Sequence, residues 1–169
     1  MDDFKVLLAN ANPPTNQPLI QKWFEFPLSN TQVTTSLNPN IPQETYLILD
    51  YQAPIKLPAN DNIDHLNRLF EAYQSIQDPG IKSVAQTLVD QWFTDVIELA
   101  EQQSALTRYP NFKNVADVVF DWVDRGLIFS DIPKTFLRYV DIQGIGDFLE
   151  ASGAYLVTIQ GVIEYNAYL

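Results

Sequence analysis

The chain has 169 residues, with 21 acidic and 10 basic side chains and a formal net charge of −11. Because 46% of its residues are hydrophobic and 12% are aromatic, it can bury a core, which separates it from acidic disordered tails. A surface this acidic repels the phosphates of nucleic acids, so direct binding of DNA or RNA is not expected. Its natural partners are basic protein surfaces, among which DNA-binding channels are the most strongly basic.

The absence of cysteine excludes disulfides, thiolate metal sites and cysteine nucleophiles. The chain begins Met1-Asp2-Asp3 and lacks the basic and apolar segments of a signal peptide. No apolar run approaches the roughly 20 residues that span a bilayer. We therefore expect a soluble, cytoplasmic protein without a membrane partner.

The first 59 residues predict a small sheet with one helix. The expected elements are strands at 4–9, 19–26 and 46–51, a helix from Asn30 to about Leu37, and Pro- and Asn-rich loops at 10–18 and 38–40.

From Asn60 the apolar spacing becomes helical. One helix begins at Asn60 or Asp61 and ends near Asp78. A second helix is predicted over 84–102, since Leu88, Trp92, Val96 and Ala100 recur at helical spacing. The acidic residues of this segment fall on the opposite half of that helix, and they are Asp90, Asp95, Glu98 and Glu101.

The last third predicts another mixed unit. Its expected elements are an edge strand at 104–109, a helix at 114–125 with Gly126 as its C-cap, short helices at 133–139 and 141–151, and a closing hairpin of 155–159 with 161–168. The whole chain is thus predicted to be α+β, divided into an N-terminal α+β unit (1–59), a central helical unit (60–103) and a C-terminal α+β unit (104–169).

Catalytic motifs are weak. The single histidine, His65, directly follows Asp64, and neighbours on a helix point in different directions, so a solvent-exposed histidine is the favoured interpretation. The pair Gly144 and Gly146 lacks the third glycine and preceding strand of a phosphate-binding loop, which favours close helix packing. No metal or cofactor is predicted, and hydrolysis by two carboxylates stays open as a minor alternative because many acidic pairs exist.

Charge placement is the remaining signal. Asp117, Asp121 and Asp124 occupy positions i, i+4 and i+7 of the helix predicted at 114–125, opposite its valines. A row of carboxylates held on a rigid helix is what imitation of DNA phosphates requires. On charge alone, the plainer interpretation is a solvated helix face on which Asp117 supports the N-terminus.

Several segments with consistent spacing resemble ArdA-type antirestriction proteins. The resemblance rests on Ile132 to Asp141 and Gly146 to Tyr155 at the C-terminal side. The matching N-terminal segments are Met1 to Asp3, Ala9-Asn10, Trp23 to Pro27, Tyr46 to Pro54, and Ile63 to Leu69. The resemblance implies an elongated arrangement of three small units. It also implies that the protein is carried by mobile genetic elements and blocks host restriction by imitating DNA.

The resemblance also implies a partner and a surface. The partner is a type I restriction-modification enzyme, whose methyltransferase core would be contacted by Asp90, Asp95, Glu98, Glu101, Asp117, Asp121 and Asp124. It implies a non-catalytic mechanism and a homodimer joined through the C-terminal unit, for which the candidate residues are Phe136, Tyr139, Val140 and Phe148. The alternative is an acidic interaction or scaffold module of a mobile element without DNA mimicry.

Overall fold

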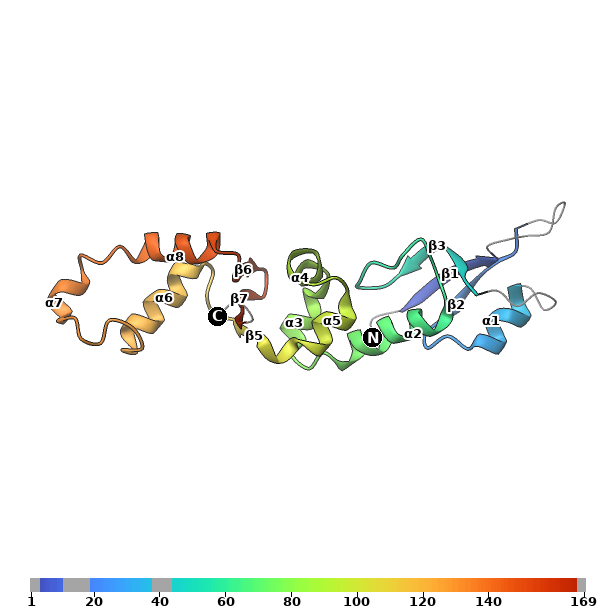
Figure 1. The fold of residues 1–169 in the computed structure, drawn as a ribbon, viewed down its shortest axis with the longest axis horizontal. Helices are drawn as coiled ribbons and strands as arrows, with labels where there is room; N and C mark the ends of the chain where they lie inside the picture. Colours follow the sequence, from blue (N-terminus) through green and yellow to red (C-terminus); the bar gives the residue numbers. More distant parts are fainter. Residues whose placement is uncertain (1–3, 11–18, 38–43, 167–169) are drawn as a thin grey trace. The chain divides into compact units, whose positions relative to one another are not determined.

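A computed structural model describes residues 4–10, 19–37 and 44–166. Residues 11–18 and 38–40 of the two predicted loops, and 167–168 of the predicted hairpin, lie outside this range. The fold is α+β, as the sequence predicted, with two small antiparallel sheets (Figure 1). Contacts divide the chain into two compact units, of which unit 1 comprises 1–77 and 85–101 and unit 2 comprises 78–84 and 102–169. The three-part division at 59 and 103 stays a prediction.

Unit 1 is built on a four-stranded antiparallel sheet with the order β2-β1-β3-β4. Its strands are β1 (Lys5–Asn10), β2 (Gln21–Glu25), β3 (Tyr46–Gln52) and the short β4 (Asn60–Asp61). Its helices are α1 (Asn30–Leu37), α2 (Ile63–Ser75), α4 (Ala85–Trp92) and α5 (Val96–Glu101). Strand β4 was not predicted, because its residues were assigned to the start of the following helix, which begins after its N-cap Asn62.

Aromatic rings join the sheet of unit 1 to α2. The ring of Phe4 lies edge-on to Phe26 and to Phe70, at centroid distances of 5.1 Å in both cases. Tyr73, one turn further along α2, also packs on Phe4 at 5.7 Å. Such edge-to-face pairs stabilise a core by about 0.5–1.5 kcal/mol each beyond the area that they bury.

The single helix predicted over 84–102 is wrong. The structure ends α4 at Trp92 and begins α5 at Val96. The carboxylate of Asp95 accepts hydrogen bonds from the backbone N–H groups of Ile97 (2.8 Å) and Glu98 (3.0 Å), as an N-cap does. The capping hydrogen bonds of Asp95 favour the start of a new helix at this point. The apolar residues before and after Asp95 nevertheless keep the spacing of one continuous helix, so their pattern does not reveal the break.

Unit 2 has a three-stranded antiparallel sheet with the order β5-β7-β6. Its strands are β5 (Leu106–Tyr109), β6 (Tyr155–Thr158) and β7 (Gly161–Tyr165). Its helices are α3 (Pro79–Ser83), α6 (Val115–Asp124), α7 (Lys134–Leu137) and α8 (Ile142–Ala151), with a 3-10 turn at Gln103–Ala105. The turn takes the first residues of the strand predicted at 104–109, and α7 is shorter than the helix predicted at 133–139.

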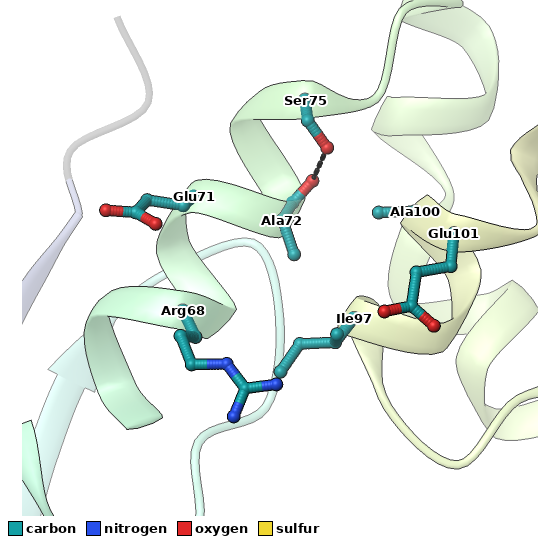
Figure 2. Close-up of a pocket in the computed structure, with 7 residues that line it drawn as sticks. All are labelled: Arg68, Glu71, Ala72, Ser75, Ile97, Ala100 and Glu101. Carbon is teal, nitrogen blue, oxygen red and sulfur yellow. Dashed lines mark hydrogen bonds between the residues drawn. The ribbon is translucent and has the colours of Figure 1, made fainter. Parts of the chain in front are cut away.

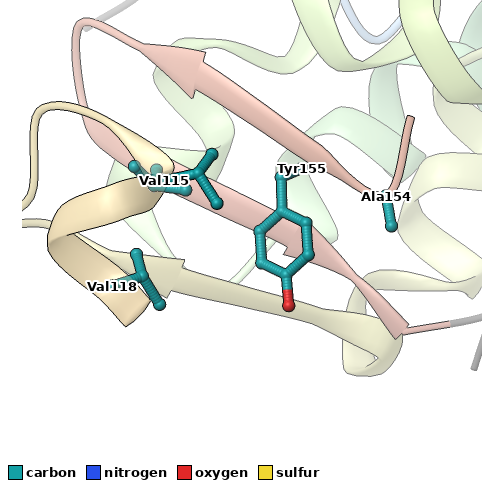
Figure 3. Packing of buried hydrophobic residues seen from close by; sticks show 5 residues of the cluster. Val115, Val118, Ala154 and Tyr155 are labelled. Atoms are coloured by element: carbon teal, nitrogen blue, oxygen red, sulfur yellow. The ribbon is translucent and has the colours of Figure 1, made fainter. Parts of the chain in front are cut away.

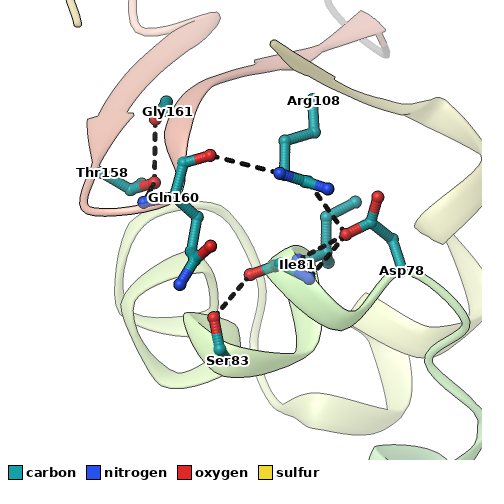
Figure 4. A network of polar contacts seen from close by, with 8 residues as sticks. Asp78, Ile81, Ser83, Arg108, Thr158, Gln160 and Gly161 are labelled. Carbon is teal, nitrogen blue, oxygen red and sulfur yellow. Dashed lines mark hydrogen bonds and ion pairs between the residues drawn. The ribbon is translucent and has the colours of Figure 1, made fainter. Parts of the chain in front are cut away.

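Asp78 fixes the unpredicted helix α3 to the sheet of unit 2. Its Oδ1 atom accepts hydrogen bonds from the backbone N–H groups of Gly80 and Ile81, and from Nε of Arg108 on β5 at 2.9 Å (Figure 4). The same guanidinium donates to the carbonyl oxygen of Gln160 at 3.4 Å. Burial raises the pKa of the Asp78 carboxyl, but these hydrogen bonds outweigh it and lower the pKa overall.

The core of unit 2 lies between α6 and the sheet. Val115 and Val118 of α6 pack with Ala154, Tyr155 and Val162 (Figure 3). All of these side chains are at least 94% buried, so the apolar face of α6 is fixed against the sheet. The partly buried residues that complete this cluster are Tyr109, Phe112, Trp122 and Leu149.

Helices α6 and α8 approach each other closely at Gly146. A Cβ atom at this position would lie 2.6 Å from the backbone nitrogen of Ala116, closer than unbonded atoms allow. The predicted role of a glycine in close helix packing is therefore confirmed for Gly146. At Gly144 the nearest atoms belong instead to the side chain of Asp141, which caps α8.

One carboxylate is buried beneath α6. Glu164 on the central strand β7 is 6% exposed and accepts hydrogen bonds from the hydroxyl groups of Tyr109 (2.7 Å) and Tyr155 (2.6 Å). Burial and the adjacent Glu164 carboxylate raise the pKa of both tyrosines. The two O–H donors thus replace the water that a buried charge loses.

Candidate partner-binding surface

The predicted acidic row on α6 has the expected helical geometry. Asp117, Asp121 and Asp124 are partly or fully exposed, while Val118 and Val119 on the opposite side are completely buried. The backbone that carries the row is therefore held by the core beneath it.

Two members of this row have local partners. Asp121 forms an ion pair with Arg125 at 3.0 Å, and Asp117 accepts a hydrogen bond from the backbone N–H of Lys113 at 3.1 Å. The N-cap Asn114 in turn accepts from the N–H of Asp117, a reciprocal arrangement close to a capping box. The exposed Asp124 has no ion pair or hydrogen bond of its side chain within the described part of the chain.

An exposed aromatic side chain lies on the same face. Phe120 is 57% exposed and follows Asp117 by three residues, so it shares the acidic side of α6. The acids alone were predicted on this face, although helical spacing also places Phe120 among them. The surface combines charge with an apolar contact.

The acids of α4 and α5 do not share one helix. Asp90 lies on α4, where Nζ of Lys56 is 2.8 and 2.9 Å from its two carboxylate oxygens. Hydrogen bonds from Lys56 and Gln86 lower the pKa of the Asp90 carboxyl. Asp95 caps α5, and the carboxylate of Glu98 accepts from the N–H of Thr94 at 2.7 Å.

Glu101, the last of these acids, borders a shallow hollow of about 380 Å³ between α2 and α5. Arg68 and Ile97 also line it, and Figure 2 shows Glu71 with its carboxylate directed away from Glu101. A second hollow of about 200 Å³ contains Asp90 and Asp95, whose carboxylates are already engaged by Lys56 and by the start of α5. Hydrolysis by two carboxylates requires a pair of free carboxylates that point toward each other, and neither hollow presents such a pair.

His65 is partly exposed and belongs to a local pair. Its Nδ1 atom lies 2.5 Å from Oδ2 of Asp61, four residues earlier on strand β4. Its neighbour in sequence, Asp64, lies on an exposed part of α2. Among the residues that the structure describes, no group of three or more His, Asp or Glu side chains is arranged to hold a metal ion.

The candidate dimer residues are largely exposed. Phe136, Tyr139 and Phe148 are 59%, 71% and 73% exposed, and Val140 is partly exposed. The guanidinium of Arg138 lies 4.8 Å from the ring centroid of Tyr139. Large apolar side chains left open to water are typical of surfaces that a partner covers.

The model of the family described as antirestriction protein (ArdA) matches residues 15–164. The chain belongs to the ArdA family of antirestriction proteins. The match includes α4, α5 and α6 together with the apolar residues of α7 and α8. The chain matches no curated protein.

Membership of the ArdA family implies antirestriction and an interaction with restriction enzymes. The resemblance identified from scattered segments is thereby confirmed at the level of the family. In the described segments of the chain, no helix combines the length and the apolar character needed to cross a bilayer.

Proposed function

We propose that this chain is a cytoplasmic, non-catalytic inhibitor that imitates DNA and occupies the DNA-binding groove of a type I restriction-modification enzyme. The observation that carries this proposal is the row of Asp117, Asp121 and Asp124 on a helix whose other face is buried. Together with the ArdA family match, it supports competition with DNA for the methyltransferase core.

The physical basis of the inhibition is charge pairing. Groups spaced three or four residues apart on a helix lie about 5–6 Å from one another, which offers successive negative charges to the Lys and Arg side chains of a DNA groove. Because the core holds α6 in place, little ordering entropy is lost on binding. Phe120 adds an apolar contact beside these charges.

Neutralisation of the α6 row tests the proposal. The triple variant Asp117→Asn, Asp121→Asn and Asp124→Asn keeps one acceptor oxygen on each side chain but removes three charges. Exposed ion pairs contribute about 0.2–1 kcal/mol each, so binding to the methyltransferase core should weaken by roughly three- to hundredfold. Phage plating on a restricting host should show the same loss of protection.

A matched control separates the row from net charge. The variant Asp64→Asn, Asp131→Asn and Glu150→Gln removes the same number of exposed charges from positions outside the row. It should retain inhibition. Equal losses in the two triple variants would refute a specific role of α6 and leave only a general effect of acidity.

Salt and DNA provide a second test. Raising the ionic strength from 0.1 to 1 M shortens the Debye length from about 10 to about 3 Å, so affinity for the enzyme should fall steeply. Duplex DNA should compete for the same site. Simultaneous binding of DNA and inhibitor, or affinity that ignores salt, would contradict mimicry.

The proposal includes a homodimer joined through Phe136, Tyr139, Val140 and Phe148. Burying these exposed side chains against a second copy would remove apolar surface from water and double the acidic surface of the inhibitor. Sedimentation equilibrium at micromolar concentration should give twice the mass of one chain, and Tyr139→Glu should give a monomer. A wild-type monomer would exclude this interface.

A scaffold or interaction module without mimicry is the second candidate. It is favoured by the internal use of several acids, since Asp90 pairs with Lys56 and Asp95 caps α5. This alternative predicts that both triple variants bind the enzyme with the affinity of the wild type, or that neither the wild type nor the variants bind it.

A further inference from the structure

Unit 2 contains a pocket that the proposed antirestriction surface does not explain. It measures about 380 Å³ and is lined by residues of α6 and α7, by Arg138 that caps the C-terminus of α7, and by the first residue of α8. Pockets for small molecules usually measure about 300–1,000 Å³ and are mostly apolar with a few polar groups. The apolar residues here are Phe120, Val123, Leu137 and Ile142.

Two cations stand beside this apolar lining. Lys134 and Arg138 both line the pocket, both are exposed, and within the described residues neither has a carboxylate partner. By contrast, Lys56 and Arg125 of this chain form ion pairs. Among the described residues that line the pocket, Asp124 is the only acid. The lining therefore carries two positive charges and one negative charge, although the chain as a whole carries a net charge of −11.

We propose that this pocket binds a small amphipathic anion, a carboxylate that carries an apolar chain. The apolar chain would leave water against Phe120 and Ile142, while Lys134 and Arg138 would hold the head group by charge-assisted hydrogen bonds. The two cations can attract an anion despite the net negative charge of the chain, because exposed charges more than about 8 Å away are largely screened at physiological salt. The pocket shares Asp124 and Phe120 with the surface proposed to bind the restriction enzyme. Its two cations and its residues from α7 and α8 lie outside that surface, so the inference does not rest on antirestriction.

Decanoate titrated calorimetrically into the full chain is a suitable probe. It should bind with one molecule per chain, and decan-1-ol, which has the same chain length without the charge, should bind at least roughly tenfold more weakly. This comparison uses only the wild-type protein and so does not depend on the folding of any variant.

Variants assign the binding to the pocket. Lys134→Gln with Arg138→Gln should weaken decanoate binding by roughly tenfold or more, whereas Lys113→Gln, a change of an exposed cation outside the pocket, should leave it unchanged. Asp124→Asn should strengthen decanoate binding because it removes the only repelling charge in the lining. The same variant lowers inhibition under the DNA-mimic proposal, so the two hypotheses can fail separately.

Three results would overturn the inference. The first is equal affinity for decanoate and decan-1-ol, and the second is decanoate binding that survives the double variant. The third is co-sedimentation with phosphatidylglycerol vesicles, which would show that the cations serve a membrane surface instead of a free ligand. A protein with this net charge should be repelled by such vesicles.

Discussion

The substitution Gly146→Ala tests the close packing of α8 on α6, the helix that carries the acidic row. The added Cβ would lie 2.6 Å from the nitrogen, 2.7 Å from Cα and 2.8 Å from Cβ of Ala116. Unbonded carbon atoms rest at about 3.5–4.0 Å, so α6 and α8 would have to separate by about 1 Å. Overpacking of this kind costs about 1–3 kcal/mol.

A gain partly offsets this cost. Alanine is favoured over glycine inside a helix by about 1 kcal/mol. Because two of the three obstructing atoms belong to the backbone, the upper part of the overpacking range applies at Gly146. The free energy of unfolding should therefore fall by about 1–2 kcal/mol, measured by urea denaturation followed by circular dichroism.

Gly144→Ala is the matched control on the same helix. Its added Cβ would meet the carboxylate of Asp141 at 2.5 Å, and the end of that side chain can rotate away. Weakening the cap costs about 1 kcal/mol, which the gain in helix propensity offsets, so stability should change little. If Gly146→Ala proves as stable as the wild type, close packing of α8 on α6 is refuted.

Two further predictions concern buried and partly buried acids. Glu164→Gln replaces one acceptor of the tyrosine hydroxyls of Tyr109 and Tyr155 by a donor, and an unsatisfied buried group should lower the free energy of unfolding by about 1–3 kcal/mol. Asp78→Ala removes the cap of α3 and the partner of Arg108, and should lower it by about 1 kcal/mol. The pKa of Asp78 is lower in the folded protein than its ordinary value of 3.8. The stabilisation that Asp78 provides is therefore fully present above pH 3.8 and is lost as the pH falls through the pKa of the folded state. The denaturation difference between wild type and Asp78→Ala should therefore vanish in acid, and a difference that persists there would contradict the assigned interaction.

The sequence predicted α6 well because independent signals agree there. Asn114 is a good N-cap, valines recur on one side, and acids occupy the other. Over 84–102 the signals conflict, since apolar spacing favours one helix while Asp95 favours a new start. The structure has two helices, with Asp95 capping the second. The spacing of apolar residues carries no information about capping, so it could not predict this break.

Partners of the acids were harder to predict than their positions. Asp121 and Arg125 are four residues apart, so helical spacing alone could have indicated their ion pair. Lys56 and Asp90 are separated by 34 residues, and only the folded arrangement of unit 1 brings them together. For the same reason, the pocket beside Lys134 and Arg138 depends on how α7 packs, which no local pattern in the sequence specifies.

Asp95 allows the charge of the proposed surface to be separated from its structural role. Asn and Asp are about equally good N-caps, whereas Ala costs about 0.5–2 kcal/mol at this position. Asp95→Asn should therefore keep the free energy of unfolding near that of the wild type, while Asp95→Ala should lower it. If the negative charge contributes to binding the restriction enzyme, both variants should bind more weakly and with a smaller dependence on salt.

A purely structural role gives a different pattern. In that case Asp95→Asn retains wild-type affinity, and only Asp95→Ala changes stability. The two measurements are independent, because urea denaturation reports the cap and titration with the methyltransferase core reports the charge. Wild-type affinity in Asp95→Asn would remove Asp95 from the proposed binding surface while leaving the α6 row to its own test.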